Sequence, residues 1–191
     1  MADGPAFYFD LGSPDAYLAA ERVLQTMPVA TEWIPVLARD LPGVESFDAF
    51  RCAEERDIVL ARYAEAVARR GLQPLRWPDP FPFDSALGMH AATYAKQIGR
   101  TVPFALAAFR QAFAGGRALD ADTVLIAAAA CEMHPTAVLK AIELRSVREE
   151  LARRTAEAAA AGVRDVPAVR VGTALFHGDA ALPGAARAAA A

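Results

Sequence analysis

Short apolar runs stand near both ends of the chain, and helical patterns fill the stretch between them. Residues 6–11, Ala-Phe-Tyr-Phe-Asp-Leu, and residues 31–37 each have the composition of a buried strand. Residues 14–27 place apolar side chains at helical spacing on one face, at Tyr17, Leu18, Val23 and Leu24. Strand, helix and strand in this order predict a βαβ unit whose two strands are parallel.

The middle of the chain predicts helices and one ordered loop. Residues 46–70 have a helical pattern that ends at Gly71. Residues 72–84 hold four prolines among Trp77, Phe81 and Phe83, which predicts a loop packed by its aromatic side chains. The stretch from Ser85 to about Gly162 predicts four or five short helices, with breaks near residues 99–100, 115–116, 134–135 and 146.

The final stretch returns to strands. Residues 166–171 and 173–177 flank Gly172 and predict a β-hairpin, followed by an Ala-rich helix from about Ala180. The order is therefore βαβ, a helical block, then ββα. The chain is expected to be an α/β protein with a discontinuous domain, residues 1–40 plus 163–191, and an inserted all-helical domain, residues 41–162.

Composition narrows the class of partner. The 191 residues are 54% hydrophobic with a net charge of −3, which allows a well-buried core and gives no charge excess for nucleic acid or an acidic membrane surface. The sequence has no run of ~18 apolar residues and no signal-peptide pattern at its start. We therefore expect a cytoplasmic protein whose partner is a small molecule.

Cysteine and histidine offer little chemistry in this sequence. Cys52 and Cys131 are far apart and neither belongs to a C-x-x-C motif, so a redox dithiol is absent. They could form a disulfide, but a cytoplasmic protein favours two buried free thiols. No His, Cys or carboxylate pair has metal-ligand spacing, so no metal is expected.

Ser13 is the candidate functional residue, because Gly12-Ser13-Pro14 joins the first strand to the first helix. Ser is a favoured N-cap and Pro a favoured first helical residue. The free N–H groups at such a helix start, together with the helix dipole, favour an anion and lower the pKa of a thiol. The Ser13 hydroxyl could donate to that thiolate, or Ser13 could be a plain N-cap.

Val166-Pro167 is the second candidate feature. A proline inside an apparent strand indicates either an edge strand or a cis peptide bond. In thioredoxin-like folds, a cis-proline lies beside the N-terminus of the active helix, and the backbone of the residue before it pairs with a thiol substrate.

These residues lie in motifs that resemble a known family. Residues 7–18, F-Y-F-D-L-G-S-P-D-A-Y-L, resemble the opening F-Y-F-D-x-x-S-P-x-x-Y-L of 2-hydroxychromene-2-carboxylate isomerases. Residues 162–168 resemble that family's G-V-x-G-V-P-T, and residues 175–179 its L-F-W-G-x-D. Kappa-class glutathione transferases share the pattern, and both groups belong to the DsbA-like thioredoxin superfamily. The resemblance covers nearly the whole chain and implies a thioredoxin-like fold with a large helical insertion.

The resemblance also implies a mechanism with a thiol cosubstrate, either glutathione or another low-molecular-weight thiol. Its sulfur would lie beside Ser13 and Pro14, and the backbone of Val166, before Pro167, would hold its cysteinyl part. The motif that contains Gly178 and Asp179 would meet its glutamyl end. The thiolate would add to an unsaturated substrate, such as an aromatic acid, and leave after a bond has rotated. The resembling families commonly form homodimers, so a homodimer is expected.

Three departures from the family pattern leave alternatives open. Ala180 stands where the family has Asp, Ala168 replaces Thr, and the chain has no Asn. Asp179 either substitutes for the family's Asp or caps a helix, and His177, in place of an aromatic residue, either lines the site or covers the sheet. The chain is then either a thiol-dependent isomerase or transferase with Ser13 as its catalytic residue, or a non-redox binding protein with a degenerate thiol site. Thiol–disulfide exchange is disfavoured because it needs a protein thiolate.

Overall fold

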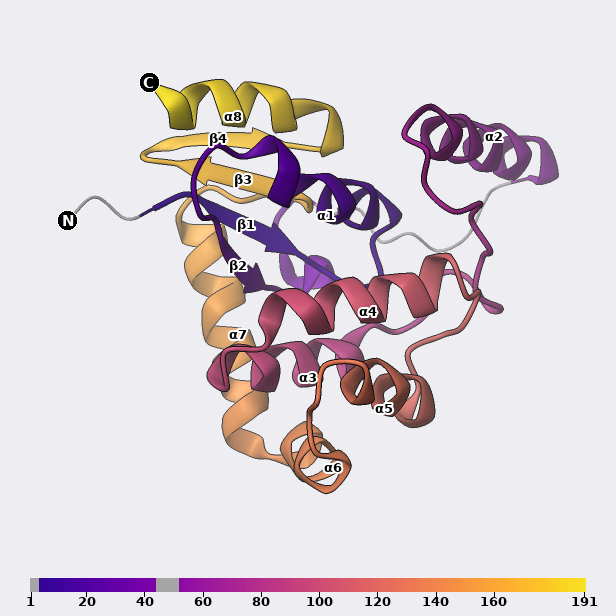
Figure 1. Ribbon diagram of the computed structural model, residues 1–191, viewed down its shortest axis with the longest axis vertical. Helices are drawn as coiled ribbons and strands as arrows, with labels where there is room; N and C mark the ends of the chain where they lie inside the picture. The colour runs from indigo at the N-terminus through magenta and orange to yellow at the C-terminus, as the bar shows by residue number, and fades with distance from the viewer. Residues whose placement is uncertain (1–3, 44–51) are drawn as a thin grey trace.

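Among the residues that the structure describes, four strands form one mixed sheet (Figure 1). The computed structural model describes residues 4–43 and 52–191. The strands are β1 (Ala6–Phe9), β2 (Glu32–Pro35), β3 (Ala168–Val171) and β4 (Ala174–His177), in the spatial order β2-β1-β3-β4. β1 is parallel to β2, and β3 is antiparallel to β1 and to β4. The predicted βαβ and ββα units therefore share one sheet.

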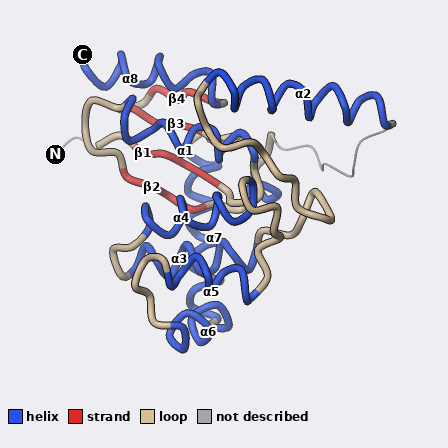
Figure 2. Tube along the Cα trace, turned by 45° about the vertical axis from the view of Figure 1, so that its right-hand side comes forward, coloured by secondary structure: helices blue, strands red, loops and turns tan. Residues whose placement is uncertain are grey.

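The helices surround this sheet and extend away from it as a lobe (Figure 2). They are α1 (Pro14–Thr26), α2 (Ala53–Arg69), α3 (Ala86–Gln97), α4 (Thr101–Phe113), α5 (Ala121–Ala129), α6 (Pro135–Glu143), α7 (Arg145–Ala160) and α8 (Leu182–Ala190), with the short 3-10 helices η1 (Ala38–Asp40) and η2 (Asp179–Ala181). α3 contacts α4, α5, α6 and α7, and α8 contacts both α1 and β3. Both views show α2 away from α5 and α6.

The residues of β1 alternate between the two faces of the sheet. Phe7 and Phe9 belong to the large core shared with α1, α3 and α4. Ala6 and Tyr8 belong to a smaller cluster on the other face, to which α7 contributes Ala158. Because successive side chains of a strand point to opposite faces, this continuous apolar run requires cover on both sides.

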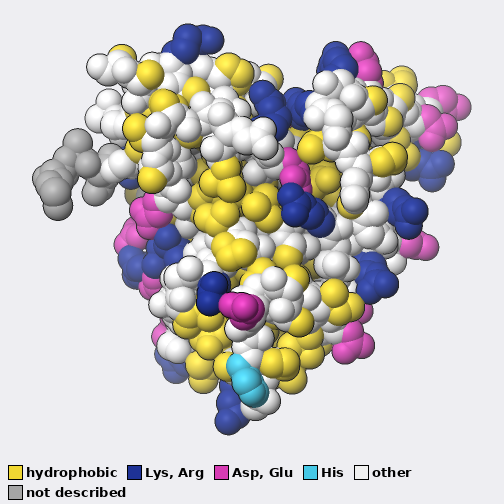
Figure 3. Space-filling view, in the orientation of Figure 1, with side chains coloured by type: hydrophobic (Ala, Val, Ile, Leu, Met, Phe, Trp, Pro, Cys, Tyr) yellow, Lys and Arg dark blue, Asp and Glu magenta, His cyan; other side chains and the backbone are white. Residues whose placement is uncertain are grey.

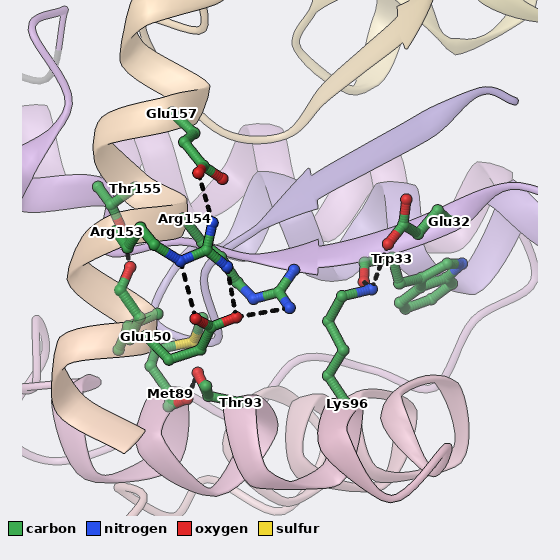
Figure 4. A network of polar contacts seen from close by, with 11 residues as sticks. Glu32, Trp33, Met89, Thr93, Lys96, Glu150, Arg153, Arg154, Thr155 and Glu157 are labelled. Carbon is green, nitrogen blue, oxygen red and sulfur yellow. Dashed lines mark hydrogen bonds and ion pairs between the residues drawn. The ribbon is translucent and has the colours of Figure 1, made fainter. Parts of the chain in front are cut away.

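Polar contacts join the inserted helices to β2 (Figure 4). Lys96 of α3 donates to the carbonyl oxygen of Trp33 at 3.0 Å and pairs with Glu32 at 2.6 Å. Along α7, which packs against β2, a row of ion pairs joins Glu150, Arg153, Arg154 and Glu157.

Most element predictions are confirmed. The five helices α3 to α7 lie between residues 85 and 162, and the last predicted break falls at Leu144 instead of residue 146. The Pro-rich loop is packed as expected, with the ring centroids of Trp77 and Phe81 4.8 Å apart. The described part of the predicted 46–70 helix is α2, and residues 46–51 of that prediction lie outside the described residues.

Three expectations need correction. Leu24 does not share the buried face of α1 but is 57% exposed. Val166 and Pro167 precede β3, because their peptide bond is cis and Pro has no N–H for the ladder. Both cysteines are free, as favoured, but only Cys131 is buried, because Cys52 is exposed at the N-cap of α2.

The predicted domain boundaries remain a prediction. The four strands of the described residues lie outside residues 41–162, in keeping with a helical insertion. In the part of the chain that the structure describes, no helix combines the length and apolar character that a membrane span requires.

Candidate functional site

Ser13 begins α1 and leaves one backbone donor at the helix start. Its hydroxyl oxygen accepts from the Ala16 N–H at 3.1 Å, and its carbonyl accepts the first intrahelical bond, from Tyr17. Pro14, at the first helical position, has no N–H. The N–H of Asp15 is then the donor of the first turn that the helix does not use. Ser13 is therefore an N-cap, and the helix start still presents an N–H to an anion.

The Val166-Pro167 peptide lies beside this helix start, although 153 residues separate Val166 from Ser13. The bond is cis, which resolves the alternative that the sequence left open. The Ser13 hydroxyl lies 3.5 Å from the carbonyl oxygen of Val166, a long and weak hydrogen bond. The N–H of Val166 donates to Oδ1 of Asp165 at 2.6 Å. Both backbone groups of Val166 therefore have partners within the chain.

A cavity of about 470 Å³ opens at this junction. Ser13, Pro14 and Asp15 line it from α1, and Asp165 and Val166 line it from the segment before β3. Its opposite wall is largely apolar and comes from α2 and the Pro-rich loop, through Val59, Tyr63, Phe81, Pro82 and Phe83. The sequence did not indicate this wall, because helical periodicity does not say where a helix lies.

Among the described residues that line the cavity, Arg39 is the cationic one. It pairs with Asp84 at 3.0 Å, and both side chains are exposed. An acidic substrate would meet this guanidinium group at the edge of the cavity, where solvent weakens the existing ion pair.

Asp10 lines the cavity from the segment between β1 and α1 and is buried. Its two carboxylate oxygens each accept a backbone N–H at 2.8 Å, from Gly12 and from Ala38. Burial raises the pKa of Asp10, and these hydrogen bonds together with Ser85 oppose that rise. A Cβ at Gly12 would lie 3.1 Å from that of Ser85, so a larger residue here would have to displace Ser85 slightly. This carboxyl group orients the loop before Ser13.

Gly178 shapes the turn beside the cis-proline. Its φ of +81° and ψ of 156° fall in a region that is essentially restricted to glycine. In that conformation its N–H donates to the carbonyl oxygen of Pro167 at 2.8 Å. Gly178 therefore fixes Pro167 next to the site, although neither residue lines the cavity.

Asp179 is held by two arginines instead of facing the cavity. Its carboxylate pairs with Arg22 of α1 at 3.1 Å and with Arg70, which follows α2, and it is 8% exposed. Gly178 occupies the N-cap position of η2, so of the two alternatives for Asp179 the N-cap is wrong. An amine of a cosubstrate would have to compete with both guanidinium groups. Figure 3 shows basic side chains gathered in the notch between α8 and α2.

His177 serves the loop that precedes the cis-proline. Its Nε2 accepts from the N–H of Arg164 at 3.2 Å, and it is not among the residues that line the cavity. Within residues 4–43 and 52–191, no group of three or more His, Cys, Asp or Glu residues could hold a metal ion.

Comparisons with known proteins agree on the fold. A family model described as a DSBA-like thioredoxin domain matches residues 6–190. The structure is similar to that of a 2-hydroxychromene-2-carboxylate isomerase, with a TM-score of 0.81, 17% identity, and coverage of 93% of this chain and 90% of that one. It is also similar to a probable DsbA oxidoreductase from Streptomyces coelicolor, with a TM-score of 0.75, 19% identity, and coverage of 97% and 88%.

A third similar structure contains a thiol compound. It is the cytosolic disulfide reductase DsbM from Pseudomonas aeruginosa with GSH, with a TM-score of 0.62, 13% identity, and coverage of 98% of this chain and 96% of that one. No curated protein sequence matches this chain. At these identities the likeness shows the fold, and the chemistry has to be argued from the residues of the site.

Proposed function

The chain belongs to the DSBA-like thioredoxin domain family, and we propose that it is a thiol-dependent isomerase or transferase that uses glutathione or another low-molecular-weight thiol. The observation that carries this proposal is the convergence on one cavity of Ser13, the unused N–H of Asp15 and the cis Val166-Pro167 peptide. A thiolate placed there lies at the positive end of α1.

Ser13 stabilises the thiolate of the cosubstrate in this proposal. Its hydroxyl proton faces the Val166 carbonyl only at 3.5 Å, so turning it toward a sulfur anion costs little. A hydrogen bond to a charged group contributes about 1.5–3 kcal/mol, equivalent to about one to two units of thiol pKa. The lack of a C-x-x-C motif separates this chemistry from disulfide exchange.

The apolar wall of the cavity is the proposed position of the organic substrate. Phe81 and Phe83 offer ring surfaces to an aromatic group, and Arg39 is close enough to the same cavity to meet a carboxylate. An aromatic, unsaturated acid such as 2-hydroxychromene-2-carboxylate, the compound named for one similar structure, fits this combination. The thiolate would add to the unsaturated bond, permit rotation, and leave.

A binding protein without catalysis is the alternative, and one observation favours it. Asp179 is neutralised by Arg22 and Arg70 and does not face the cavity. A glutamyl amine would therefore find no free carboxylate there. In this alternative the cavity binds, against its apolar wall, a small molecule that carries no thiol.

Thermal unfolding with added ligands tests the proposal. A ligand that binds the native state stabilises it by about 2.7 kcal/mol at a hundredfold excess over its Kd. We expect stabilisation by glutathione and a weaker effect from S-methylglutathione, which cannot form a thiolate. Glutathione-dependent isomerisation of 2-hydroxychromene-2-carboxylate would establish the reaction. Stabilisation by this acid alone, with none by glutathione, cysteine or cysteamine, would establish the alternative.

A further inference from the structure

A carboxyl group and a phenol meet at the mouth of the cavity. The hydroxyl of Tyr63, on α2, donates to Oδ2 of Asp15, on α1, at 2.8 Å. The two residues are 48 positions apart and line the same cavity as Ser13. The chain thus places a carboxyl group next to the proposed thiolate, in the first turn of the same helix.

The position of Tyr63 is determined by its surroundings. Its side chain is 7% exposed, and its ring meets that of Trp77 edge to face with centroids 5.5 Å apart. The guanidinium of Arg62 lies 5.2 Å from the ring centroid. Burial raises the pKa of Tyr63, so the phenol keeps its proton and acts as a donor. Tyr63 therefore holds Oδ2 of Asp15 in place and leaves Oδ1 available to a ligand.

Asp15 keeps one carboxylate oxygen, Oδ1, without a hydrogen-bond partner among the described residues, because the Tyr63 hydroxyl engages Oδ2. Both oxygens of Asp10 are engaged by backbone N–H groups. Asp84 and Asp165 each accept through Oδ1: Asp84 from Arg39 and the Ala86 N–H, and Asp165 from the Val166 N–H. Among the described carboxyl groups that line the cavity, Asp15 is distinguished by its place in the first turn of α1, two residues after Ser13, and by the hydrogen bond from Tyr63.

The environment of Asp15 favours its protonated form. Burial is the main cause of its raised pKa. The hydrogen bond from Tyr63 and the charge of Arg62, both on α2, lower that pKa, while Asp179 on η2 and Asp165 before β3 raise it. A raised pKa makes a carboxyl group better able to accept and return a proton, as general acid–base catalysis requires.

We propose that Asp15 is the acid–base residue of this site and that Tyr63 is the residue that positions it. This inference rests on the proposed function. The carboxylate of Asp15 takes the proton from the bound thiol, which gives a thiolate and a carboxylic acid. When the thiolate adds to the unsaturated carbonyl compound, the acid gives the proton to the resulting enolate. Asp15 takes the proton back as the thiolate leaves, so no proton is consumed.

This assignment keeps one negative charge in the site at each step. Before proton transfer the charge is on Asp15, after it on sulfur, and after addition on the substrate until Asp15 protonates it. A carboxylate that did not accept the proton would repel the thiolate, by about 1–4 kcal/mol at 4 Å. If Asp15 accepts the proton, removing its charge should lower turnover. If Asp15 only repels the thiolate, removing its charge should leave turnover unchanged or raise it.

Asp15→Asn separates the two roles, because Asn keeps the shape and can accept the Tyr63 hydrogen bond but cannot carry a proton. Two quantities are measured in wild type and variant: the thiolate absorbance of bound glutathione against pH, and the rate of glutathione addition to 2-hydroxychromene-2-carboxylate and to benzylideneacetone. We expect thiolate formation at the same or lower pH and turnover lower by about 100-fold at neutral pH. Turnover that is unchanged or higher would overturn the assignment.

Two further variants complete the test. Asp57→Asn makes the same chemical change at an exposed position of α2 outside the cavity lining, and should change neither quantity. Tyr63→Phe removes the hydrogen bond that lowers the pKa of Asp15. The acid limb in the pH profile of turnover should therefore move to higher pH. Loss of stability without movement of that limb would show that Tyr63 is only structural.

The failures of the two proposals can be distinguished. If glutathione neither stabilises the wild type nor forms a thiolate on it, the thiol site itself is wrong, and the role of Asp15 falls with it. If glutathione binds as a thiolate but wild type accelerates neither reaction, the thiol site stands and the acid–base assignment is overturned.

Discussion

Replacing Ser13 separates its structural role from its proposed chemical one. Ser13→Ala removes the N-cap bond to the Ala16 N–H, which is 3.1 Å long. Loss of an N-cap costs about 1 kcal/mol. The second contact, to the Val166 carbonyl, is 3.5 Å long and adds little. For a domain of this length, about 1 kcal/mol lowers Tm by about 2–4 °C.

The effect of Ser13→Ala on a bound thiol should be larger than its effect on the fold. The lost hydrogen bond to the thiolate contributes about 1.5–3 kcal/mol, so the pKa of bound glutathione should rise by about one to two units. Thiolate absorbance against pH measures this rise, and thermal unfolding measures the cap.

Ser13→Asp is the matched control. Asp is as good an N-cap as Ser, so Tm should stay near that of the wild type. Its carboxylate would lie where the thiolate is proposed to bind, so glutathione binding should be lost by repulsion. The reasoning is refuted if Ser13→Ala lowers Tm as calculated and leaves the pKa and the affinity of glutathione unchanged. Ser13 would then be a helix cap and nothing more.

Three further predictions concern aspartates around the site. Asp179→Ala should destabilise the fold by about 2–3 kcal/mol, because it leaves two half-buried guanidinium groups unpaired; urea unfolding measures this, and Asp57→Ala should have almost no effect. The folded-state pKa of Asp15 is raised, so its stabilising contribution is present below about pH 4 and is lost as pH rises through the folded value. Asp15→Asn should therefore gain stability relative to wild type over that rise, and a constant difference from acid to neutral pH would contradict this. Asp165→Ala frees the Val166 N–H and should tighten glutathione binding about fivefold, equivalent to about 1 kcal/mol. Titration calorimetry measures the Kd, and an equal or weaker affinity than that of the wild type would contradict this prediction.

The sheet and the helix boundaries were predictable because their signals are local. A Ser-Pro pair starts α1, and the alternation of Phe7 and Tyr8 between faces follows from strand geometry. The proline after Val166 was an anomaly within an apparent strand, and that anomaly marks the cis peptide. Each of these inferences needs only a few adjacent residues.

The wall of the cavity was not predictable in the same way. Tyr63 is one of several apolar positions in a helical pattern. The helical period predicts that it is buried but does not identify the element against which it packs. Its hydroxyl reaches α1 only because α2 and the Pro-rich loop pack at the cavity. Likewise, the sequence left Asp179 either as a substitute for a family carboxylate or as a helix cap, whereas Arg22 and Arg70 approach it from other elements.

Asp15 shows why a local interpretation of the helix start is incomplete. An acidic residue in the first turn is favoured by the helix dipole, and this explains it without any function. Yet the dipole favours the ionised carboxylate and lowers a pKa, whereas burial at the cavity raises the pKa of this one. A residue that served only the dipole would be best placed in solvent, where ionisation costs nothing. Placing it in a cavity beside Ser13, with Tyr63 on one oxygen, gives up part of that stabilisation. That loss is the physical reason to assign Asp15 to proton transfer instead of helix stability.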